Sequence, residues 1–351
     1  MIRDEDRPQL RSTMFLIGAE ELGGLVTIEA AMPAIEQAMR DLSQDEYIAP
    51  QRWTMALDRT AKMGFMPGAL PSVGQFGIKV LSLFDAASRG DLPSHQGVML
   101  LFDMNDGRPL CALDAAALTS LRTAAATAIA TRALARPDSE TLAIIGCGDL
   151  AQPHLAAMKS ILPLRRVFIW NRTRERAEWF AEHHGKDMDV ILCDTPADTV
   201  RDADVVCTLT SARAPILSGE DFRPGQHINL VGSSVAEARE VDGATIARSR
   251  YFVDSRSHAL SQAGELRDAI ERGLLGEDHI SGEIGEVLTG RVGGRQNAEE
   301  TTIYKSLGHV VQDLAVANLA YTAAIGLPAM PPPQTVRQTF PLPRPGPFVA
   351  G

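Results

Sequence analysis

Apolar residues recur at two different spacings along the chain, and the change between them divides it into two parts. In the first part, helical spacing covers residues 26–40, with Pro33 interrupting it, and an alanine-rich helix is predicted over residues 114–135. Two strand-like apolar runs, residues 76–83 and 98–103, lie between these helices. Turn-forming residues follow the second run, so we predict a hairpin there and a mixed α and β unit overall.

From residue 141 onward, short apolar runs alternate with amphipathic helical stretches such as residues 174–183. This alternation is typical of a parallel sheet covered by helices, so we predict an α/β fold with a Rossmann-type, doubly wound sheet. The predicted strands are residues 141–145, 167–170, 190–193, 205–209, 228–231 and 251–253. The proline-rich segment at residues 331–351 lacks apolar periodicity and predicts an extended tail.

Composition limits the possible partners. The chain has 351 residues, which suggests about two domains, and 45% of them are hydrophobic, enough for a sizeable core. The net charge of −10 argues against nucleic acid or an anionic membrane as the main partner. A small anionic substrate is still compatible with it, because a few local arginines and lysines can build a cationic site.

Neither targeting segments nor cysteine patterns are found in the sequence. No stretch reaches the ~20 apolar residues of a membrane span, and the first residues lack the apolar core of a secretory signal. The four cysteines are scattered, with no CxxC or Cys/His spacing, so we interpret them as reduced packing residues and expect no metal site. These features favour a cytoplasmic protein.

A glycine-rich turn follows the strand predicted at residues 141–145 and precedes a helix predicted at residues 150–160. It has the form GxGxxA, in which the first glycine allows a tight turn and the second lets the backbone approach a pyrophosphate. The helix N-terminus then offers N–H groups to the phosphates. The predicted cofactor contacts are Gly146, Gly148, Asp149, Leu150 and Ala151. The alternative is an ordinary turn between strand and helix.

The end of the next predicted strand indicates which dinucleotide binds. An acidic residue there would bind the ribose 2′-hydroxyl of NAD, but this chain has no acid at that point. Arginines would instead attract the 2′-phosphate of NADP through charge-assisted hydrogen bonds. We therefore predict NADP(H) over NAD(H), with contacts from Asn171, Arg172, Thr173 and Arg176. The alternative for each arginine is a solvated charge at the start of a helix.

Several segments, in their order and spacing, resemble the ornithine cyclodeaminase/mu-crystallin family over residues 14–327. They are SHQGVMLLFD (94–103), LTSLRTAAATAIATRALA (118–135), IIGCGDLAQPH (144–154), FIWNRTRERAEWF (168–180), ADVVCTLTSARAPIL (203–217), INLVGSS (228–234), EIGEVLTG (283–290) and TIYKSLGHVVQDLAVA (302–317). The resemblance implies a homodimer. It also implies a substrate and dimerisation domain from residues 1–129 and 313–330, with an NAD(P)-binding Rossmann domain, residues 130–312, inserted between them.

The resemblance also implies a site for a small imino or amino acid, with Arg52, Lys79 and Arg122 binding its carboxylate. Cationic donors suit that task chemically, since arginine offers a carboxylate two parallel hydrogen bonds. Each residue has a structural alternative: a surface charge for Arg52, an exposed strand lysine for Lys79, and a buried ion pair for Arg122. Lys79 is also our candidate for proton transfer, because desolvation and neighbouring arginines would lower its pKa.

Other positions follow from the resemblance alone. Ser94 and His95 match a segment near the nicotinamide and substrate; His95 is predicted to be catalytic, with a purely structural histidine as the alternative. Asp313 either supports the site or only caps or pairs within its helix. Further cofactor contacts are implied at Thr208, Leu209, Thr210, Val231, Gly232, Ser233 and Ser306.

Two departures from the cyclodeaminases guide the functional prediction. Their acid after the fifth Rossmann strand is replaced by Ser234, and the acid before their Met-Pro pair is absent, because Gly64 and Phe65 precede Met66-Pro67 here. Without these acids, loss of an amine lacks its acid–base partner. We therefore predict an NADP(H)-dependent reductase of the C=N bond of an imino acid. The alternatives are an ammonia-releasing cyclodeaminase that recycles NAD and a non-catalytic NADPH-dependent binding protein.

Overall fold

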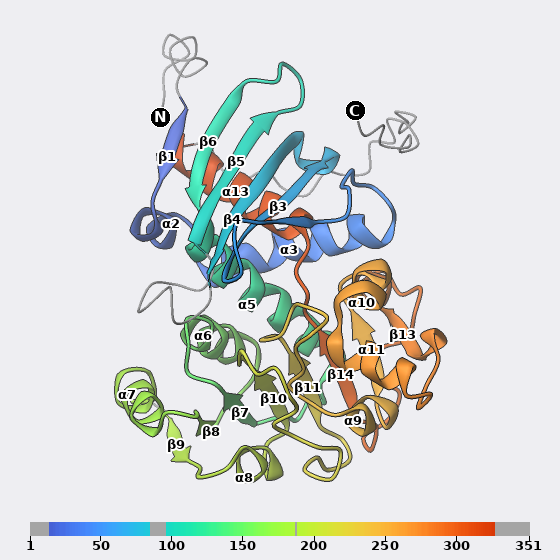
Figure 1. Ribbon diagram of the computed structural model, residues 1–351. Coiled ribbons are helices and arrows are strands. Elements are labelled where there is room, and N and C mark those ends of the chain that lie inside the picture. The colour runs from blue at the N-terminus through green and yellow to red at the C-terminus, as the bar shows by residue number, and fades with distance from the viewer. Residues whose placement is uncertain (1–13, 85–95, 187, 327–351) are drawn as a thin grey trace.

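A computed structural model describes residues 14–84, 96–186 and 188–326, which form two β-sheets joined by long helices (Figure 1). The first sheet has six strands in the order β1-β6-β5-β4-β3-β2, and the second has eight in the order β13-β12-β14-β11-β10-β7-β8-β9. The fold is therefore α/β, with a Rossmann-type parallel sheet and a smaller mixed unit, as predicted. The predicted tail lies outside the described residues.

The first sheet is antiparallel apart from the pairing of β1 with β6. Its strands are β1 (Phe15–Ile17), β2 (Trp53–Ala56), β3 (Ala61–Leu70), β4 (Gln75–Phe84), β5 (Gln96–Asp103) and β6 (Pro109–Asp114). The hairpin predicted after residue 103 is confirmed, since it joins β5 to β6. The helices of this unit are α2 (Ala19–Leu25), α3 (Ile28–Ser43), α5 (Ala115–Leu134) and α13 (Val310–Ala324), with a 3₁₀ turn at Pro71–Val73.

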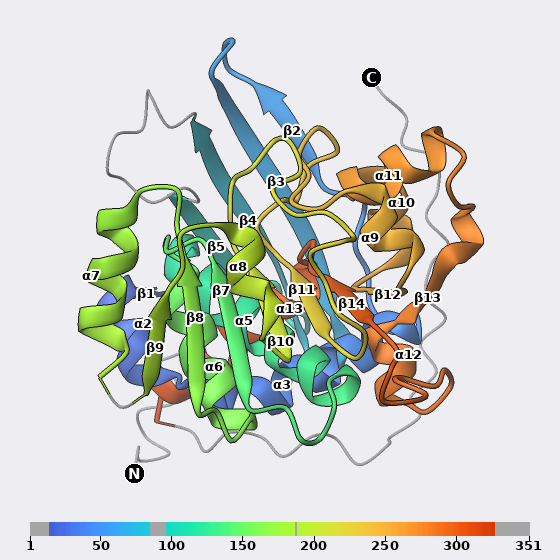
Figure 2. The same cartoon turned by 90° about the horizontal axis from the view of Figure 1, so that it is seen from below.

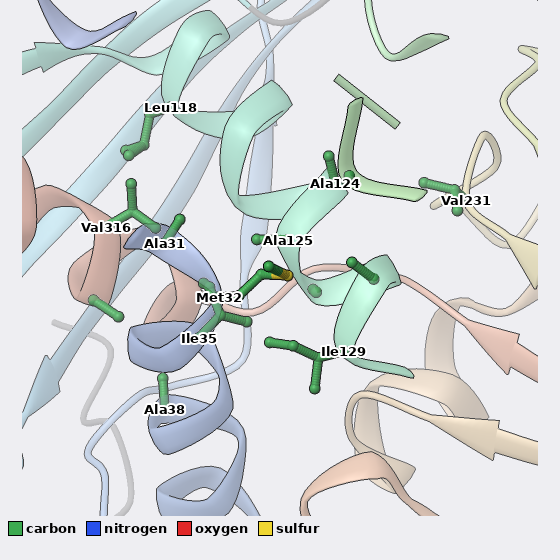
Figure 3. Close-up of a cluster of buried hydrophobic side chains, with 14 of the residues drawn as sticks. Ala31, Met32, Ile35, Ala38, Leu118, Ala124, Ala125, Ile129, Val231 and Val316 are labelled. Carbon is green, nitrogen blue, oxygen red and sulfur yellow. The ribbon is translucent and has the colours of Figure 1, made fainter. Parts of the chain in front are cut away.

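Helix α3 runs through Pro33, so the predicted interruption there is wrong. Proline removes one backbone hydrogen bond from the helix, but apolar packing along the buried face of α3 stabilises the remaining turns. Figure 3 shows Met32 and Ile35 of this face beside Ala125 and Ile129 of α5. The strong apolar face of α3 therefore outweighs the local preference of proline.

The strands of the second sheet are all parallel to their neighbours, so their carboxyl ends lie along one edge (Figure 2). They are β7 (Thr141–Ile145), β8 (Arg166–Trp170), β9 (Asp189–Leu192), β10 (Val205–Thr208), β11 (His227–Leu230), β12 (Arg250–Val253), β13 (Ile280–Glu283) and β14 (Thr302–Lys305). All six predicted strands of this sheet are confirmed. The sequence did not predict β13 or β14, and β14 lies between β11 and β12.

The remaining helices belong to the second unit. They are α6 (Ala151–Ile161), α7 (Arg174–His184), α8 (Pro196–Arg201), α9 (Gly243–Ala247), α10 (Arg256–Gln262), α11 (Gly264–Glu271) and α12 (Ile284–Leu288), with a 3₁₀ turn at Glu277–His279. Among the described residues, no helix combines the length and the apolarity that crossing a bilayer requires.

Two helices connect the sheets. Helix α5 leaves the first sheet and leads into β7, and α13 follows β14 and packs against α3 and β3 of the first unit (Figure 1). The domain boundaries predicted at residues 129/130 and 312/313 lie inside these two helices, and the division at those residues stays a prediction. Side chains on α5 and α13 are thereby held beside the carboxyl edge of the parallel sheet.

Candidate active site

The turn after β7 has the backbone shape that a dinucleotide requires. Gly146 has a φ of 103°, and a Cβ at this position would lie 3.0 Å from the carbonyl oxygen of Leu209. Gly148 faces open space, since no atom lies within 4 Å of the place its Cβ would occupy. Helix α6 begins three residues later, at Ala151. The turn therefore fits a pyrophosphate that contacts the backbone and the N-terminal end of α6.

Asn171 fixes the loop after β8 against this turn. Its Oδ1 accepts a 3.0 Å hydrogen bond from the amide of Cys147, and its Nδ2 donates to the carbonyl of Thr173 at 2.8 Å. Arg172 and Arg176 are exposed, and neither has an ion-pair partner in the described ranges. The loop thus leaves two arginine side chains available to an anion beside the glycine turn.

Glu240 joins the loops that follow β10 and β11. Its carboxylate accepts hydrogen bonds from the Thr208 hydroxyl and the Thr210 amide, both at 2.7 Å, and from the Gly232 amide at 2.9 Å. Burial raises the pKa of Glu240. Glu240 was not predicted from the sequence. The predicted cofactor contacts at the end of β10 and in the two loops that Glu240 holds are Thr208, Leu209, Thr210, Val231, Gly232 and Ser233.

A buried ion pair lies next to the loop that follows β11. Lys305, at the end of β14, is 2.8 Å from Glu265 of α11, and both side chains are buried. The Lys305 ammonium also donates to the carbonyl of Ser233 at 2.5 Å. Ser306, the last predicted cofactor contact, follows directly and is buried. This pair fixes the position of the Ser233 loop relative to β14.

Lys79 and Arg122 meet at one carboxylate, that of Asp313. Lys79 lies on the face of β4 that alternation turns toward the helices, and it is 1% exposed. Its ammonium is 2.8 Å from Asp313 Oδ1 and 3.3 Å from the Thr119 hydroxyl. The Nε of Arg122, on α5, donates to the same Oδ1 at 3.1 Å. The exposed-lysine alternative is therefore excluded, and Asp313 pairs between elements rather than within its own helix.

Burial and charge adjust the acidity of Lys79. Desolvation lowers its pKa, Asp313 opposes this, and Arg122 adds to the lowering, which brings the pKa of Lys79 to about 8. Within the described part of the chain, Oδ2 of Asp313 is buried and has no hydrogen-bond partner. A buried acceptor without a donor is unfavourable, so this oxygen is suited to receive an N–H from a ligand.

Arg52 approaches the same region from the segment before β2. Its guanidinium donates to the carbonyl of Leu307 at 2.9 Å and to that of Ser234 at 2.7 Å. Burial, reinforced by Arg122, lowers the pKa of Arg52 to about 10. Arg52 is therefore a bonded, partly buried cation rather than a surface charge.

The turn between β14 and α13 is shaped around the two arginines. Gly308 has a φ of 77°, and a Cβ there would lie 2.7 Å from Nη1 of Arg122. Asp254, after β12, accepts hydrogen bonds from the amides of Leu307 and Gly308 at 2.8 and 2.6 Å and from the hydroxyl of Tyr304. Asp254 thus holds the turn in place, a role that was not predicted from the sequence.

The structure brings together most of the predicted site. Arg52, Lys79 and Arg122 lie around the β14–α13 turn, which follows a carboxyl end of the parallel sheet. The glycine turn and the loops after β8, β10 and β11 lie at the same edge. Ser94 and His95 lie outside the described residues. This combination suits a nicotinamide dinucleotide beside a small carboxylate ligand.

Residues 12–326 match the Ornithine cyclodeaminase/mu-crystallin family. The ketimine reductase mu-crystallin of Mus musculus is 35% identical over 315 residues, which cover 89% of this chain and 97% of the mouse protein. The chain belongs to the ornithine cyclodeaminase/mu-crystallin family. The resemblance seen in the sequence is confirmed.

Solved structures of similar proteins have the same fold. The Thermococcus litoralis Δ1-pyrroline-2-carboxylate reductase in complex with NADH and L-proline is 30% identical, with a TM-score of 0.86 over 89% of this chain and 98% of that one. An archaeal alanine dehydrogenase dimer with bound NAD is 29% identical, with a TM-score of 0.84 over 89% of this chain and 96% of that one.

As a member of the ornithine cyclodeaminase/mu-crystallin family, this chain departs at two positions from what the resemblance implies for the cyclodeaminases. Ser234 offers a backbone carbonyl to Arg52 where the resemblance places an acid in the cyclodeaminases. Gly64 lies within β3, and Phe65 stacks on Trp53 with ring centroids 5.3 Å apart. Neither position supplies a carboxylate for a cationic amine.

Proposed function

We propose that this protein is an NAD(P)H-dependent imine reductase that converts a 2-imino acid to the corresponding amino acid. The observation that carries the proposal is the buried contact of Lys79 and Arg122 with one carboxylate, that of Asp313. Two cations share one anion, so a carboxylate ligand completes the balance of charge. The mouse and Thermococcus relatives, named a ketimine reductase and a pyrroline-2-carboxylate reductase, support a C=N bond as the target.

The substrate carboxylate binds to Arg52 and Arg122. Both guanidiniums lie at the β14–α13 turn, and Arg52 uses only backbone carbonyls as partners among the described residues. A carboxylate oxygen is a stronger acceptor than a carbonyl for such a donor. The substrate nitrogen then lies toward Lys79 and the unpartnered Oδ2 of Asp313.

Lys79 supplies the proton. When bound, the reduced nicotinamide supplies hydride to the imine carbon, so carbon gains the electron pair and nitrogen needs one proton. The Lys79 ammonium, with a pKa of about 8, is mostly protonated at neutral pH yet acidic enough to give that proton up. Asp313 holds the ammonium in place, and solvent restores the proton after product leaves. His95 and Ser94 remain candidates for the catalytic and cofactor roles predicted from the family resemblance.

The cofactor preference is proposed to be NADP(H) over NAD(H). Support comes from the exposed Arg172 and Arg176 beside the glycine turn and from the absence of an acid at the end of β8. The bound nucleotides named for the two relatives are NADH and NAD. The proposed preference for NADP(H) therefore rests on the arginines of this chain and not on the nucleotides bound to its relatives.

A homodimer is proposed through the face of the first sheet opposite its helices. Phe76 and Phe102 stack there at 5.1 Å, and Phe76 is 37% exposed. Exposed apolar patches of this kind favour association, and the archaeal relative is a dimer. We expect Phe76→Glu to shift the molar mass in light scattering from dimer to monomer; an unchanged mass would place the interface elsewhere.

A cytoplasmic location is also proposed. Its support is that all four cysteines are free, since disulfides are rare in proteins of the cytosol.

A substrate panel tests the function. The panel contains Δ1-pyrroline-2-carboxylate, its six-membered analogue, and 2-oxo acids with ammonia or methylamine, each with NADPH and NADH. The expected result is substrate-dependent oxidation of the nicotinamide and formation of an amino acid. Ammonia release from ornithine or lysine without net oxidation would instead identify a cyclodeaminase. Tight NADPH binding with no turnover of any compound would identify a binding protein.

A further inference from the structure

A pair of buried histidines borders the substrate arginines and has no part in the chemistry above. His258 of α10 is 6% exposed, and His309, the residue before α13, is 2% exposed. Their ring centroids are 4.9 Å apart, and the ring of Tyr47 packs edge-on against His309 at 5.1 Å. Three separate segments therefore converge on the two imidazoles.

His258 is buried, but one of its ring nitrogens lacks a hydrogen-bond partner among the described residues. Its Nδ1 is buried and has no hydrogen bond within the described residues. A buried polar atom without a hydrogen-bond partner is unfavourable, so we expect a ligand, water or ion to complete it. His309 differs, because its Nδ1 accepts from the amide of Val311 at 3.4 Å.

The surroundings of the pair are short of negative charge. Both imidazoles have a pKa below the usual value, that of His258 being about 4; burial is the main cause, and the positive charge of Arg52 adds to it. Arg52 itself bonds only to carbonyls among the described residues. The nearby Asp254 is already engaged by two amides and the hydroxyl of Tyr304.

We infer that His258 and His309, beside Arg52, form a subsite for a second, distal carboxylate on the substrate, so that the preferred substrate is a dicarboxylic 2-imino acid. The inference rests on the proposed function, in which Arg52 and Arg122 bind the first carboxylate. A distal carboxylate would accept from the imidazole N–H groups, and the nearby positive charge of Arg52 would favour its binding. A cationic side chain would face Arg52 and Arg122 without a countercharge.

Paired substrates of equal length test this inference. The kcat/KM for 2-oxoglutarate with ammonia is compared with that for 2-oxopentanoate with ammonia, using NADPH. We expect the dicarboxylate to be favoured at least tenfold. We expect His258→Leu to lower this ratio about tenfold, and His258→Asn, which keeps a hydrogen-bonding group, to lower it less.

A control variant and an inhibition measurement on the wild-type protein complete this test. His154 is also fully buried but bonds to Leu150 and Thr127 near the cofactor turn, so His154→Leu should leave the ratio unchanged. In the wild type, glutarate should inhibit at least tenfold more strongly than pentanoate. Equal inhibition, or a ratio near one, would overturn the subsite while leaving imine reduction intact. Turnover of no imine at all would overturn the proposed function and the subsite with it.

Discussion

Asp313→Asn is the most informative single substitution, because one oxygen of this side chain holds two cations. Oδ1 of Asp313 is 2.8 Å from Lys79 and 3.1 Å from Arg122, and the carboxylate is fully buried. Asparagine keeps the shape and removes the charge. Removing one partner of a buried ion pair typically costs about 3–5 kcal/mol, and we expect a loss of unfolding free energy in that range.

The kinetic effect follows from the acidity of Lys79. Asp313 raises the pKa of Lys79 against the lowering by burial and by Arg122. Without that carboxylate, the ammonium loses its proton at lower pH. Since the proposed acid is the protonated lysine, activity is present below the Lys79 pKa and falls as pH rises through it. The alkaline limb should lie near pH 8 in the wild type and about one pH unit or more lower in Asp313→Asn, equivalent to about 1.4 kcal/mol.

The assay is the pH profile of kcat/KM for imine reduction, with denaturant unfolding of both proteins. Glu265→Gln provides a matched control, because Glu265 also forms a buried pair with a lysine, Lys305, at 2.8 Å. We expect this control to lose stability but to keep its alkaline limb at the wild-type pH. If Asp313→Asn keeps its alkaline limb at the wild-type pH as well, Lys79 is not the titrating acid.

Three further predictions concern the arginines and the cofactor loops. Gly308→Ala should raise the KM for the imino acid at least tenfold without changing the Kd for NADPH, because the alanine Cβ would lie 2.7 Å from Arg122. Steady-state kinetics measures the KM and fluorescence titration measures the Kd; an unchanged KM would contradict this prediction. Glu240→Gln should weaken NADPH about tenfold, because an amide N–H would face the donors of Thr208, Thr210 or Gly232; a wild-type Kd would show that these loops are fixed by other contacts. Arg172→Asp should raise the Kd for NADPH at least tenfold and that for NADH less than threefold; equal changes would exclude contact with a 2′-phosphate.

Much of the fold is predictable from the sequence where each element has its own local pattern. Alternation along β4 predicts that Lys79 projects opposite to Ile78 and Val80, and the structure adds that its face, with Leu81, is the buried one. Strand β3 was not predicted from the sequence, because it contains Gly64, Pro67 and Gly68, and glycine and proline normally disfavour strands. Gly68 has a tertiary reason, since a Cβ there would lie 2.5 Å from Val310 of α13.

The candidate site was predictable where a residue carries charge in an apolar setting or belongs to a motif. Arg122, in an alanine-rich helix, and the glycines of the turn are of this kind. Glu240, Asp254 and His258 were not predicted, because their roles depend on contacts between elements that are distant in the chain. Glu240 follows β11 yet bonds to residues after β10, and Asp254 follows β12 yet bonds to the turn after β14.

The transfer of a labelled hydrogen from NADPH to the product distinguishes imine reduction from the alternative functions. Wild-type protein is supplied with NADPH carrying deuterium at its transferable position, together with the imino acid on which it is most active. We expect one deuterium on the α-carbon of the product amino acid for each NADPH oxidised, with the product nitrogen unlabelled. An unlabelled α-carbon, or ammonia released with the nicotinamide unchanged, would contradict it.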